Sequence, residues 1–452
     1  MENNALVHST LEELCSEFRA NNKIESSNYE KFNVKRGLRN NDGTGVMAGL
    51  TLICNVHGFR VVDNERIPEH GVLSYRGMDV RELVEGCSNE NRFGFEETTY
   101  LLLFGKLPTK PQLEAFCQVI NECRDLPVYF TEDMIIKAPS PDIMNKMARS
   151  VLALYSYDDK PDDTSLENLM RQSIMLIAQL PTIMTYAYQV KRRHYEKKSM
   201  YFHPIIEGHS TAESILNALR SDRSFTDEEA KLLDICLVLH AEHGGGNNSS
   251  FATRVLTSSG TDTYSAIAAG IGSLKGPRHG GANIKVQEMM GYIQENVKDW
   301  HDEDEIKLCL KNIVNKEGGD GSGLIYGMGH AVYTLSDPRA IILKEKARGL
   351  AEKRGMLDRF ELIERVEALA PAVFAEVKGD KKTISANVDM YSGLVYESLG
   401  ITPDLYTPMF AISRIAGWCA HRIEEYTTGG RIIRPAYKSL APAQKYSPLE
   451  LR

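Results

Sequence analysis

The sequence lacks several patterns that would assign it to a special class of protein. Its eight cysteines are scattered and form no C-x-x-C pair, so neither a disulfide framework nor a thiolate metal site is indicated. The longest apolar stretch, 174–188, contains Gln179 and Pro181 and is shorter than the roughly 20 residues that a membrane-spanning helix needs. We therefore expect reduced, mostly buried thiols, a buried core helix over 174–188, and no membrane span.

A positive charge excess and a targeting segment are also missing. Lys and Arg total 53 and Asp and Glu total 61, a formal net charge of −8, which disfavours nonspecific binding to nucleic acid or to an anionic membrane. The first residues, Met1 to Asn4, provide neither a cationic start nor an apolar core, and Leu451-Arg452 matches no retention or peroxisomal signal. We therefore expect a cytoplasmic protein that captures anionic ligands through local contacts.

What is present is typical of a folded, mostly helical chain. The 452 residues are 42% apolar and 25% charged, as in average globular proteins, and at roughly 150 residues per domain they suggest about three domains, or two large ones. Strand-forming residues concentrate in 49–62 and 71–76, which predicts a small sheet near the N-terminus. Elsewhere helical patterns dominate, so we predict a mainly α fold with minor β structure.

Capping patterns predict where several helices begin. Thr10 with Glu13, and Thr226 with Glu229, match the capping box and predict helices that start at about residues 11 and 227. Thr407-Pro408 predicts a cap and a first-turn proline for a long apolar-striped helix over 408–425.

Helix-breaking glycine and proline residues suggest one domain boundary. A helix rich in Ala and Gly runs from about Asp262 to Leu274 and stops at Gly276-Pro277. A more polar region of about 110 residues follows before apolar helices resume after Asp389. This pattern predicts a smaller helical domain, 279–391, inserted into a larger one made of 1–278 and 392–452.

His240 and His243 end the helix that begins at 227 and lead into 244–250, a run of Gly, Asn and Ser. An H-x-x-H pair can bind a metal, although no third ligand is visible. Two histidines at a helix end can instead be core or capping residues. A histidine that opens onto a loop with many unobstructed N–H groups can also bind a carboxylate or phosphate. The residues alone leave these three interpretations open.

Two further histidines adjoin glycine-rich loops. His279 follows Gly276-Pro277 and precedes two glycines, which is typical of a site loop between helices, although an ordinary turn is the alternative. His330 ends the run 318–330, whose spacing is not G-x-G-x-x-G and which does not follow a strand, so we exclude a Rossmann site.

Charged residues complete the set of candidates. Asp337-Pro338-Arg339 resembles a helix start whose arginine, facing His330, would form a carboxylate clamp, unless Arg339 points to solvent. Asp389 is a lone carboxylate that could cap a helix beginning near Tyr391. Arg414 lies within the apolar-striped helix, where a buried cation needs an anionic partner or ligand. Arg434 lies in a C-terminal extension and could reach a neighbouring surface. With no thiol nucleophile, metal cluster or cofactor motif, this inventory suits a polycarboxylate substrate.

Six motifs, in order and at matching spacing, resemble those of the citrate synthase family, and the resemblance extends from about residue 40 to 440. They are His240-Ala-Glu-His243, Gly276-Pro-Arg-His279-Gly-Gly-Ala-Asn283, Gly327-Met-Gly-His330-Ala-Val-Tyr333 with Asp337-Pro-Arg339, Asn387-Val-Asp389-Met-Tyr-Ser-Gly393, Ser413-Arg414 with Gly417-Trp418 and Ala420-His421-Arg422, and Ile433-Arg434-Pro435. The resemblance implies an all-α homodimer whose large and small domains close over oxaloacetate and acetyl-CoA, giving citrate and CoA.

The resemblance also implies roles for single residues. Asp389 would remove a proton from the acetyl methyl group, His279 would hydrogen-bond the thioester carbonyl, and His330 would polarise the oxaloacetate ketone. The oxaloacetate carboxylates would be held by His243, Arg339 and Arg414, and by Arg434 from the other subunit.

Coenzyme A contacts are expected at Gly327 and Gly329. They are also expected at Arg278, where many members of the family have leucine and which could instead be a salt-bridged surface residue. The resemblance implies no bound metal and no permanent cofactor.

Three alternatives to citrate synthesis remain at this stage. A 2-methylcitrate synthase would use the same residues with propionyl-CoA, because one extra methylene changes selectivity only modestly. A catalytically silent relative could serve as a binding or assembly protein, and a metalloprotein could be built around His240 and His243.

Overall fold

The computed structural model describes residues 5–40, 43–62, 65–379 and 384–451. Residues 1–4, on which the expected localisation partly rests, lie outside this part of the chain. Two compact units are present, one made of 1–49 with 434–452 and the other of 50–433.

The described residues of the first unit form one longer helix and several short elements. They comprise α1 (Ala5–Asn21), α2 (Ser27–Lys31) and the 3₁₀ turns η1 (Arg36–Leu38) and η5 (Leu449–Leu451). The predicted start at about residue 11 was wrong, because Thr10 lies inside α1. The preceding Ala5 and Leu6 favour helix strongly enough to carry it through the capping pattern.

The second unit is mainly helical with a small antiparallel sheet, which confirms the predicted fold class. The strands are β1 (Cys54–Val62), β2 (Glu65–Tyr75) and β3 (Met78–Asp79), and the α-helices are α3 (Val80–Asn89), α4 (Phe95–Phe104), α5 (Lys110–Glu122), α6 (Ile143–Leu154), α7 (Leu166–Tyr195), α8 (Thr211–Leu219), α9 (Asp227–His240), α10 (Asn248–Thr257), α11 (Thr263–Leu274), α12 (Ala282–Asn296), α13 (Glu303–Val314), α14 (Pro338–Lys353), α15 (Leu357–Lys378), α16 (Asp389–Ser398) and α17 (Tyr406–Thr427). Shorter turns are η2 (Thr131–Ile136), η3 (Tyr155–Tyr157) and η4 (Pro403–Leu405).

The hairpin of β1 and β2 packs against the loop that leads into α14. The register pairs Cys54 with Tyr75 and is interrupted by a bulge between His57 and Phe59. At Gly71 the backbone N–H donates to the Ser336 carbonyl at 3.1 Å, and a Cβ there would lie 2.2 Å from that oxygen. This close approach therefore requires a glycine.

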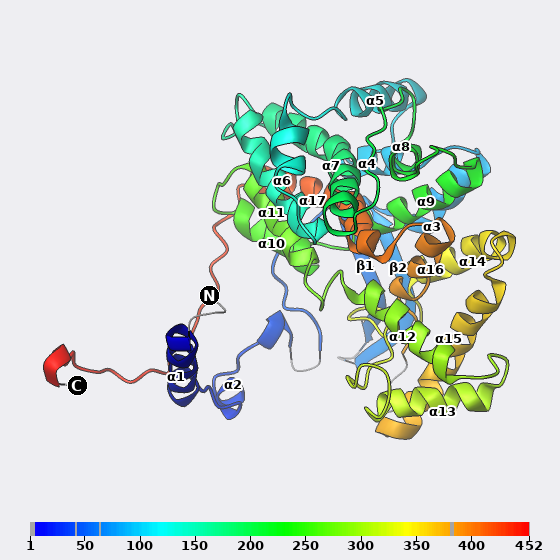
Figure 1. Ribbon diagram of the computed structural model, residues 1–452. Helices are drawn as coiled ribbons and strands as arrows, with labels where there is room; N and C mark the ends of the chain where they lie inside the picture. The colour runs from blue at the N-terminus through cyan, green and yellow to red at the C-terminus, as the bar shows by residue number, and fades with distance from the viewer. Residues whose placement is uncertain (1–4, 41–42, 63–64, 380–383, 452) are drawn as a thin grey trace. The chain divides into compact units, whose positions relative to one another are not determined.

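Helix α17 is the buried centre of the second unit. Its residues from Tyr406 to Ile423 are all buried, and it packs against α4, α7, α9, α10 and α11; Figure 1 shows it among helices from much earlier in the chain. The expected cap at Thr407 was wrong, since the helix begins at Tyr406 after Leu405, with no side-chain cap. The 3₁₀ turn η4 leads directly into it, so the chain is already helical before Thr407.

Several other predicted helices are confirmed. Thr226 and Glu229 form the capping box of α9, Asp262 caps α11, and Asp337 caps α14. The apolar stretch 174–188 is the mostly buried middle of α7. In the described part of the chain, no helix combines the length and apolar character that crossing a membrane requires.

Helices α12 to α16 pack largely on one another. Contacts join α12 to α13 and α16, α13 to α15, and α14 to α15 and α16, while α14 and α16 also contact α9. Figure 1 shows α12 to α15 grouped together. The insertion of a separate domain over 279–391 stays a prediction, because the second unit includes these residues without division.

Candidate active site

The end of α9 and the residues that follow it bury both His240 and His243. His240 is buried, its Nδ1 donates to the Cys236 carbonyl at 2.8 Å, and burial lowers its pKa to about 3, so it is a neutral core histidine. The described residues contain no group of three or more His, Cys, Asp or Glu side chains that could hold a metal.

His243 is in contact with His330 and Tyr333. The His243 ring lies edge-on to both, with centroid distances of 5.0 Å to His330 and 5.5 Å to Tyr333. Tyr333 stacks on His330 at 4.6 Å. Burial and the nearby cation of Arg339 hold the pKa of His243 well below its usual value, and its buried Nε2 has no hydrogen-bond partner among the described residues. A neutral imidazole with an unused nitrogen can bind a ligand.

The loop around His330 sets the tautomer of that side chain. The backbone N–H groups of Val332 and Tyr333 donate to His330 Nδ1 at 3.0 and 3.1 Å. Because Nδ1 accepts both bonds, the proton of the neutral ring is on Nε2. His330 can therefore donate a hydrogen bond from Nε2 to a carbonyl oxygen.

Asp337 holds Arg339 and also reaches the start of α16. Its two carboxylate oxygens accept from Arg339 Nε at 3.0 Å and Nη2 at 2.7 Å, and one of them accepts from the Val388 N–H at 3.3 Å. Burial alone would lower the pKa of Arg339, but the facing carboxylate raises it, so the guanidinium is charged. Arg339 is buried and does not point to solvent, which rules out one of the two readings of this motif.

Arg414 is a buried cation with unused donors. It is 0% exposed, and its Nε donates to the His240 carbonyl at 2.7 Å. Neither Nη1 nor Nη2 has a hydrogen-bond partner among the described residues. Its guanidinium lies 4.7 Å from the centroid of the Phe410 ring. An unpartnered buried guanidinium is costly without an anion, so this side chain indicates an anion site.

Asp389 lies at the start of α16. The expected helix start near Tyr391 was wrong, because α16 begins at Asp389 itself and no side chain caps it; Asn387 instead accepts from the Asp389 N–H at 3.0 Å. Burial raises the pKa of Asp389 to about 6, against the lowering effect of Arg339. A carboxylate with this pKa can act as a general base near neutral pH.

His279 lies in the turn between α11 and α12. Its backbone N–H donates to the Gly276 carbonyl at 2.9 Å, and its Nε2 lies 3.1 Å from Ser249 Oγ on α10. Burial and, to a lesser degree, the charge of Arg414 lower its pKa to about 4. The ring is therefore neutral at physiological pH.

The glycine-rich run connects His330 to Asp389. The Gly327 carbonyl accepts from the Asn387 N–H at 2.8 Å, and the Gly329 N–H donates to the Ser385 carbonyl at 2.7 Å. The Gly329 amide is thus already in use within the chain. Arg278 is exposed, so both of its predicted roles stay predictions.

Arg434 belongs to the first compact unit, where its side chain is exposed. The six other predicted catalytic and carboxylate-binding residues all belong to the second unit. Its predicted role therefore stays a prediction.

The sequence analysis did not predict a buried hydrogen-bond network that includes Glu242, the residue before His243. His421 Nε2 donates to Glu242 Oε1 at 2.9 Å, and Arg254 donates to His421 Nδ1, with 2.7 Å from Nη2. Burial alone would raise the pKa of Glu242, but His421 and Arg414 lower it, so the group is ionised. Three polar or charged residues on the apolar helix α17 contact this network and were the available signal for it: His421, Glu424 and Glu425.

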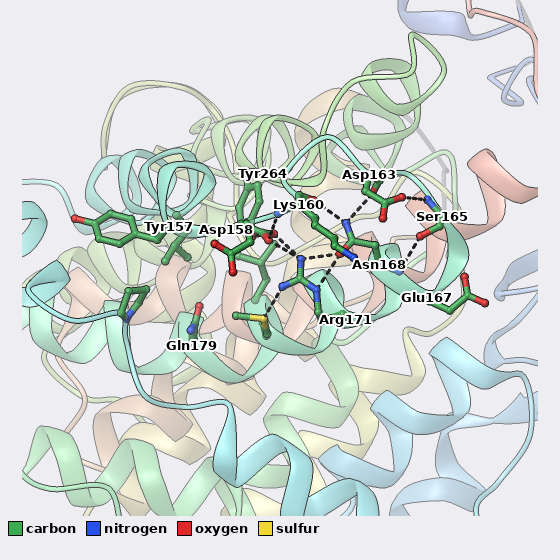
Figure 2. Close-up of a pocket in the computed structure, with 15 residues that line it drawn as sticks. Tyr157, Asp158, Lys160, Asp163, Ser165, Glu167, Asn168, Arg171, Gln179 and Tyr264 are labelled. Atoms are coloured by element: carbon green, nitrogen blue, oxygen red, sulfur yellow. Dashed lines mark hydrogen bonds and ion pairs between the residues drawn. The ribbon is translucent and has the colours of Figure 1, made fainter.

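A separate cavity of about 550 Å³ lies at the beginning of α7 (Figure 2). None of the predicted site residues line it. Arg171 donates to Asp158 at 2.6 Å and to Asn168 at 2.9 Å, and Tyr264 donates to Asp158 at 2.6 Å. Because these polar groups satisfy one another, they join α7 to α11 without indicating a ligand.

The site thus combines two buried cations, neutral imidazoles and one carboxylate base. The charges of Arg339 and Arg414 both act on the pKa of His243 and Asp389. Such a set can bind a small dianion, polarise a carbonyl with His330 and remove a weakly acidic proton with Asp389.

Comparisons with known proteins agree with this chemistry. Residues 42–436 match the family model described as citrate synthase, C-terminal domain. A citrate synthase from Synechocystis sp. is 34% identical over 375 residues, which covers 81% of this chain and 84% of that protein. The 2-methylcitrate synthase 2 of Corynebacterium glutamicum is 31% identical over 424 residues, 93% of this chain and 98% of that protein.

Solved structures are similar along nearly the whole chain. The citrate synthase of the archaeon Thermoplasma acidophilum, in a ternary complex with carboxymethyl coenzyme A and oxaloacetate, has a TM-score of 0.73 and 27% identity, covering 92% of this chain and 99% of that one. The citrate synthase of Thermotoga maritima has a TM-score of 0.72 and 28% identity, with 93% and 99% covered.

Proposed function

Because the chain belongs to the citrate synthase family of transferases, we propose that it condenses acetyl-CoA with oxaloacetate and water to give citrate and CoA. The observation that carries this proposal is Arg414, whose two Nη atoms are buried and unpartnered. Oxaloacetate offers two carboxylates and a ketone, and the charged Arg339 and the donor Nε2 of His330 complete a matching set. The Thermoplasma relative is described in complex with oxaloacetate and a coenzyme A derivative, which supports these substrates.

In the proposed mechanism, Asp389 removes a proton from the acetyl methyl group while His279 donates a hydrogen bond to the thioester oxygen. A carboxylate is a weak base for this proton, so the developing enolate needs placed donors in a site without water. His330 polarises the ketone through Nε2 and protonates the new alkoxide. His243, Arg339 and Arg414 hold the carboxylates throughout.

We also propose the assembly that the family resemblance implies. A small domain, 279–391, closes over a large domain, 1–278 and 392–452, and coenzyme A is held at Gly327, Gly329 and Arg278. Two chains form a cytoplasmic homodimer in which Arg434 binds the oxaloacetate of the other subunit. No permanent cofactor takes part.

A second candidate is 2-methylcitrate synthesis from propionyl-CoA. The matches to two 2-methylcitrate synthases of Corynebacterium glutamicum favour keeping it, since they cover 93% and 89% of this chain. The two activities need the same base, donors and carboxylate ligands, and they differ by one methylene on the acyl chain.

The test compares kcat/KM for acetyl-CoA and propionyl-CoA, with and without oxaloacetate, by loss of the thioester absorbance. Consumption that depends on oxaloacetate and favours acetyl-CoA is the expected result, and a preference for propionyl-CoA would establish the second candidate. Asp389→Ala, purified in parallel, controls for contaminating thioesterases and should be inactive. Equal rates without oxaloacetate would contradict both activities.

Subunit mixing tests the shared site. Arg434→Ala and Asp389→Ala are each expected to be inactive, but a mixed dimer contains one site with both native residues. Mixing after partial dissociation should therefore restore part of the activity. If the mixture stays inactive while mass analysis detects the mixed dimer, Arg434 does not act across subunits.

A further inference from the structure

Ser249 on α10 connects His279 to Trp418 on α17. Its Oγ lies 3.1 Å from His279 Nε2, accepts from Trp418 Nε1 at 3.1 Å and is placed to donate to Asn247 Oδ1 at 2.9 Å. Ser249 and Trp418 are both 0% exposed, and the two helices pack against each other, as Figure 1 shows. Bulk solvent therefore does not reach the Ser249 hydroxyl or the Trp418 indole.

The indole fixes part of the hydrogen-bond pattern, because Trp418 Nε1 can only donate. Ser249 Oγ must accept from it, which leaves the hydroxyl one proton and two possible acceptors, His279 Nε2 and Asn247 Oδ1. If the hydroxyl donates to His279, the imidazole proton is on Nδ1. If it donates to Asn247, His279 Nε2 carries the proton and donates to Ser249.

The proposed reaction requires the first pattern. Since Nε2 of His279 is occupied by Ser249, only Nδ1 remains to donate to a thioester oxygen. Nδ1 of a neutral ring carries a proton only if Nε2 accepts. The ring is neutral because burial lowers its pKa to about 4.

We propose that Trp418 is a positioning residue that acts through Ser249 to hold His279 in the tautomer with its proton on Nδ1. This inference rests on the proposed function of His279. A hydroxyl that accepts a hydrogen bond becomes a stronger donor, because bonds in a chain polarise one another. An oxygen that already accepts from the indole also accepts a second N–H bond less readily, so the indole favours donation from Ser249 to His279 over donation from His279 to Ser249.

The surroundings hold the indole in place. A Cβ at Gly270 on α11 would lie 3.0 Å from Trp418 Cδ2 and 3.2 Å from Cε2, so the ring packs directly against the backbone there. Asn247, the cap of α10, still accepts from the Ser249 N–H at 3.3 Å, so its oxygen is not left unpaired when the hydroxyl donates to His279.

The kinetic test is a double-mutant cycle with Trp418→Phe and Ser249→Ala. Loss of one neutral hydrogen bond predicts a fall in kcat of about threefold to tenfold for Trp418→Phe, with KM for oxaloacetate unchanged. In the Ser249→Ala background, Trp418→Phe should have little further effect, because the indole acts through that hydroxyl. Trp300→Phe, at the only other tryptophan of the chain, is the matched control and should leave kcat unchanged. Additive losses of kcat would overturn the proposal.

A spectroscopic readout separates this inference from the proposed function. In protein labelled with ¹⁵N-histidine, the Nδ1 and Nε2 shifts of His279, assigned by comparison with His279→Asn, report the tautomer directly. The expected result is a proton on Nδ1 in the native chain and a mixture of tautomers in Trp418→Phe. A proton on Nε2 in the native chain would overturn the proposal even if the enzyme makes citrate.

A second variant covers the case in which Trp418→Phe does not fold. Benzothienylalanine keeps the shape of tryptophan but replaces N–H with sulfur, and in a Trp300→Phe chain it is incorporated only at position 418. The same mixture of tautomers and the same fall in kcat are expected. A native tautomer and native kcat would refute a role for the indole N–H.

Discussion

Replacement of Arg414 by methionine separates binding from stability. Two unpartnered Nη atoms that each form a charge-assisted hydrogen bond of about 1.5–3 kcal/mol would together contribute about 3–6 kcal/mol to binding of a dianion. Their loss predicts a Kd for oxaloacetate that rises by about 10²–10⁴-fold.

Stability of the ligand-free protein should respond differently. Arg414→Met loses the bond to the His240 carbonyl, the contact with the Phe410 ring and the attraction to the ionised Glu242. It also removes the desolvation cost of a buried charge without an anionic hydrogen-bond partner, which offsets these losses. Its free energy of unfolding should therefore lie within about 1 kcal/mol of the native value. In native protein, oxaloacetate at about 100 times its Kd should add about 2.7 kcal/mol of stability, and in the variant that gain should vanish at the same concentration.

Arg422→Met is the matched control. Arg422 lies on the same helix and is equally buried, but it donates to Thr263 Oγ1, Thr257 Oγ1 and the Thr261 carbonyl. Its replacement leaves these groups unpaired, so Tm should fall by several degrees while the Kd for oxaloacetate stays unchanged.

Thermal unfolding with and without oxaloacetate, together with calorimetric titration, measures both quantities for the two variants. A Kd within threefold of native for Arg414→Met would refute the assignment of an anion site. A large loss of stability in the ligand-free Arg414→Met protein would show instead that Arg414 is a structural cation.

Four further predictions concern the base and one close contact. Asp389→Asn should lower kcat by about 10²–10⁴-fold with little change in KM for oxaloacetate, measured by steady-state kinetics. Because the pKa of Asp389 is raised to about 6, kcat should fall about tenfold per pH unit below that pH; a flat profile would contradict its role. The raised pKa favours the neutral form, so native stability should decline as pH rises from 3.8 to about 6, and Asp389→Asn should have the higher Tm above that window but not below it. A Cβ at Gly417 would lie 2.0 Å from Glu242 Oε2, whereas one at Gly272 meets no atom within 4 Å, so Gly417→Ala should lower Tm strongly while Gly272→Ala should not; equal Tm values would contradict the contact.

Local patterns predicted most helices but misplaced several starts. Thr226 caps α9 as expected, whereas Thr10 and Thr407 lie inside their helices. A cap residue marks the start of a helix only where the residues before it are not helical. Whether they are helical depends on their own helix propensity and on neighbouring turns. Asp389 was misread for the same reason, since the turn before it is already helical at Val388.

Individual sequence motifs identified the candidate site residues. Local patterns could not predict how these residues are arranged relative to one another. His243, Arg339 and Arg414 come from segments far apart in the chain, and no periodicity predicts that they share one cluster. The hydrogen bond from the Val388 N–H to Asp337 joins the start of α16 to the cap of α14. It could not be predicted from the sequence for the same reason.

By itself the sequence determined the mainly α class, the small N-terminal sheet and the residues with reactive or charged side chains, because periodicity, capping and residue chemistry are local properties. Only the tertiary structure decided that the two Nη atoms of Arg414 lack hydrogen-bond partners among the described residues while Arg422 has three, and that His330 carries its proton on Nε2. Hydrogen-bond satisfaction and burial depend on which distant backbone groups approach a side chain, and that is settled by packing of the whole unit.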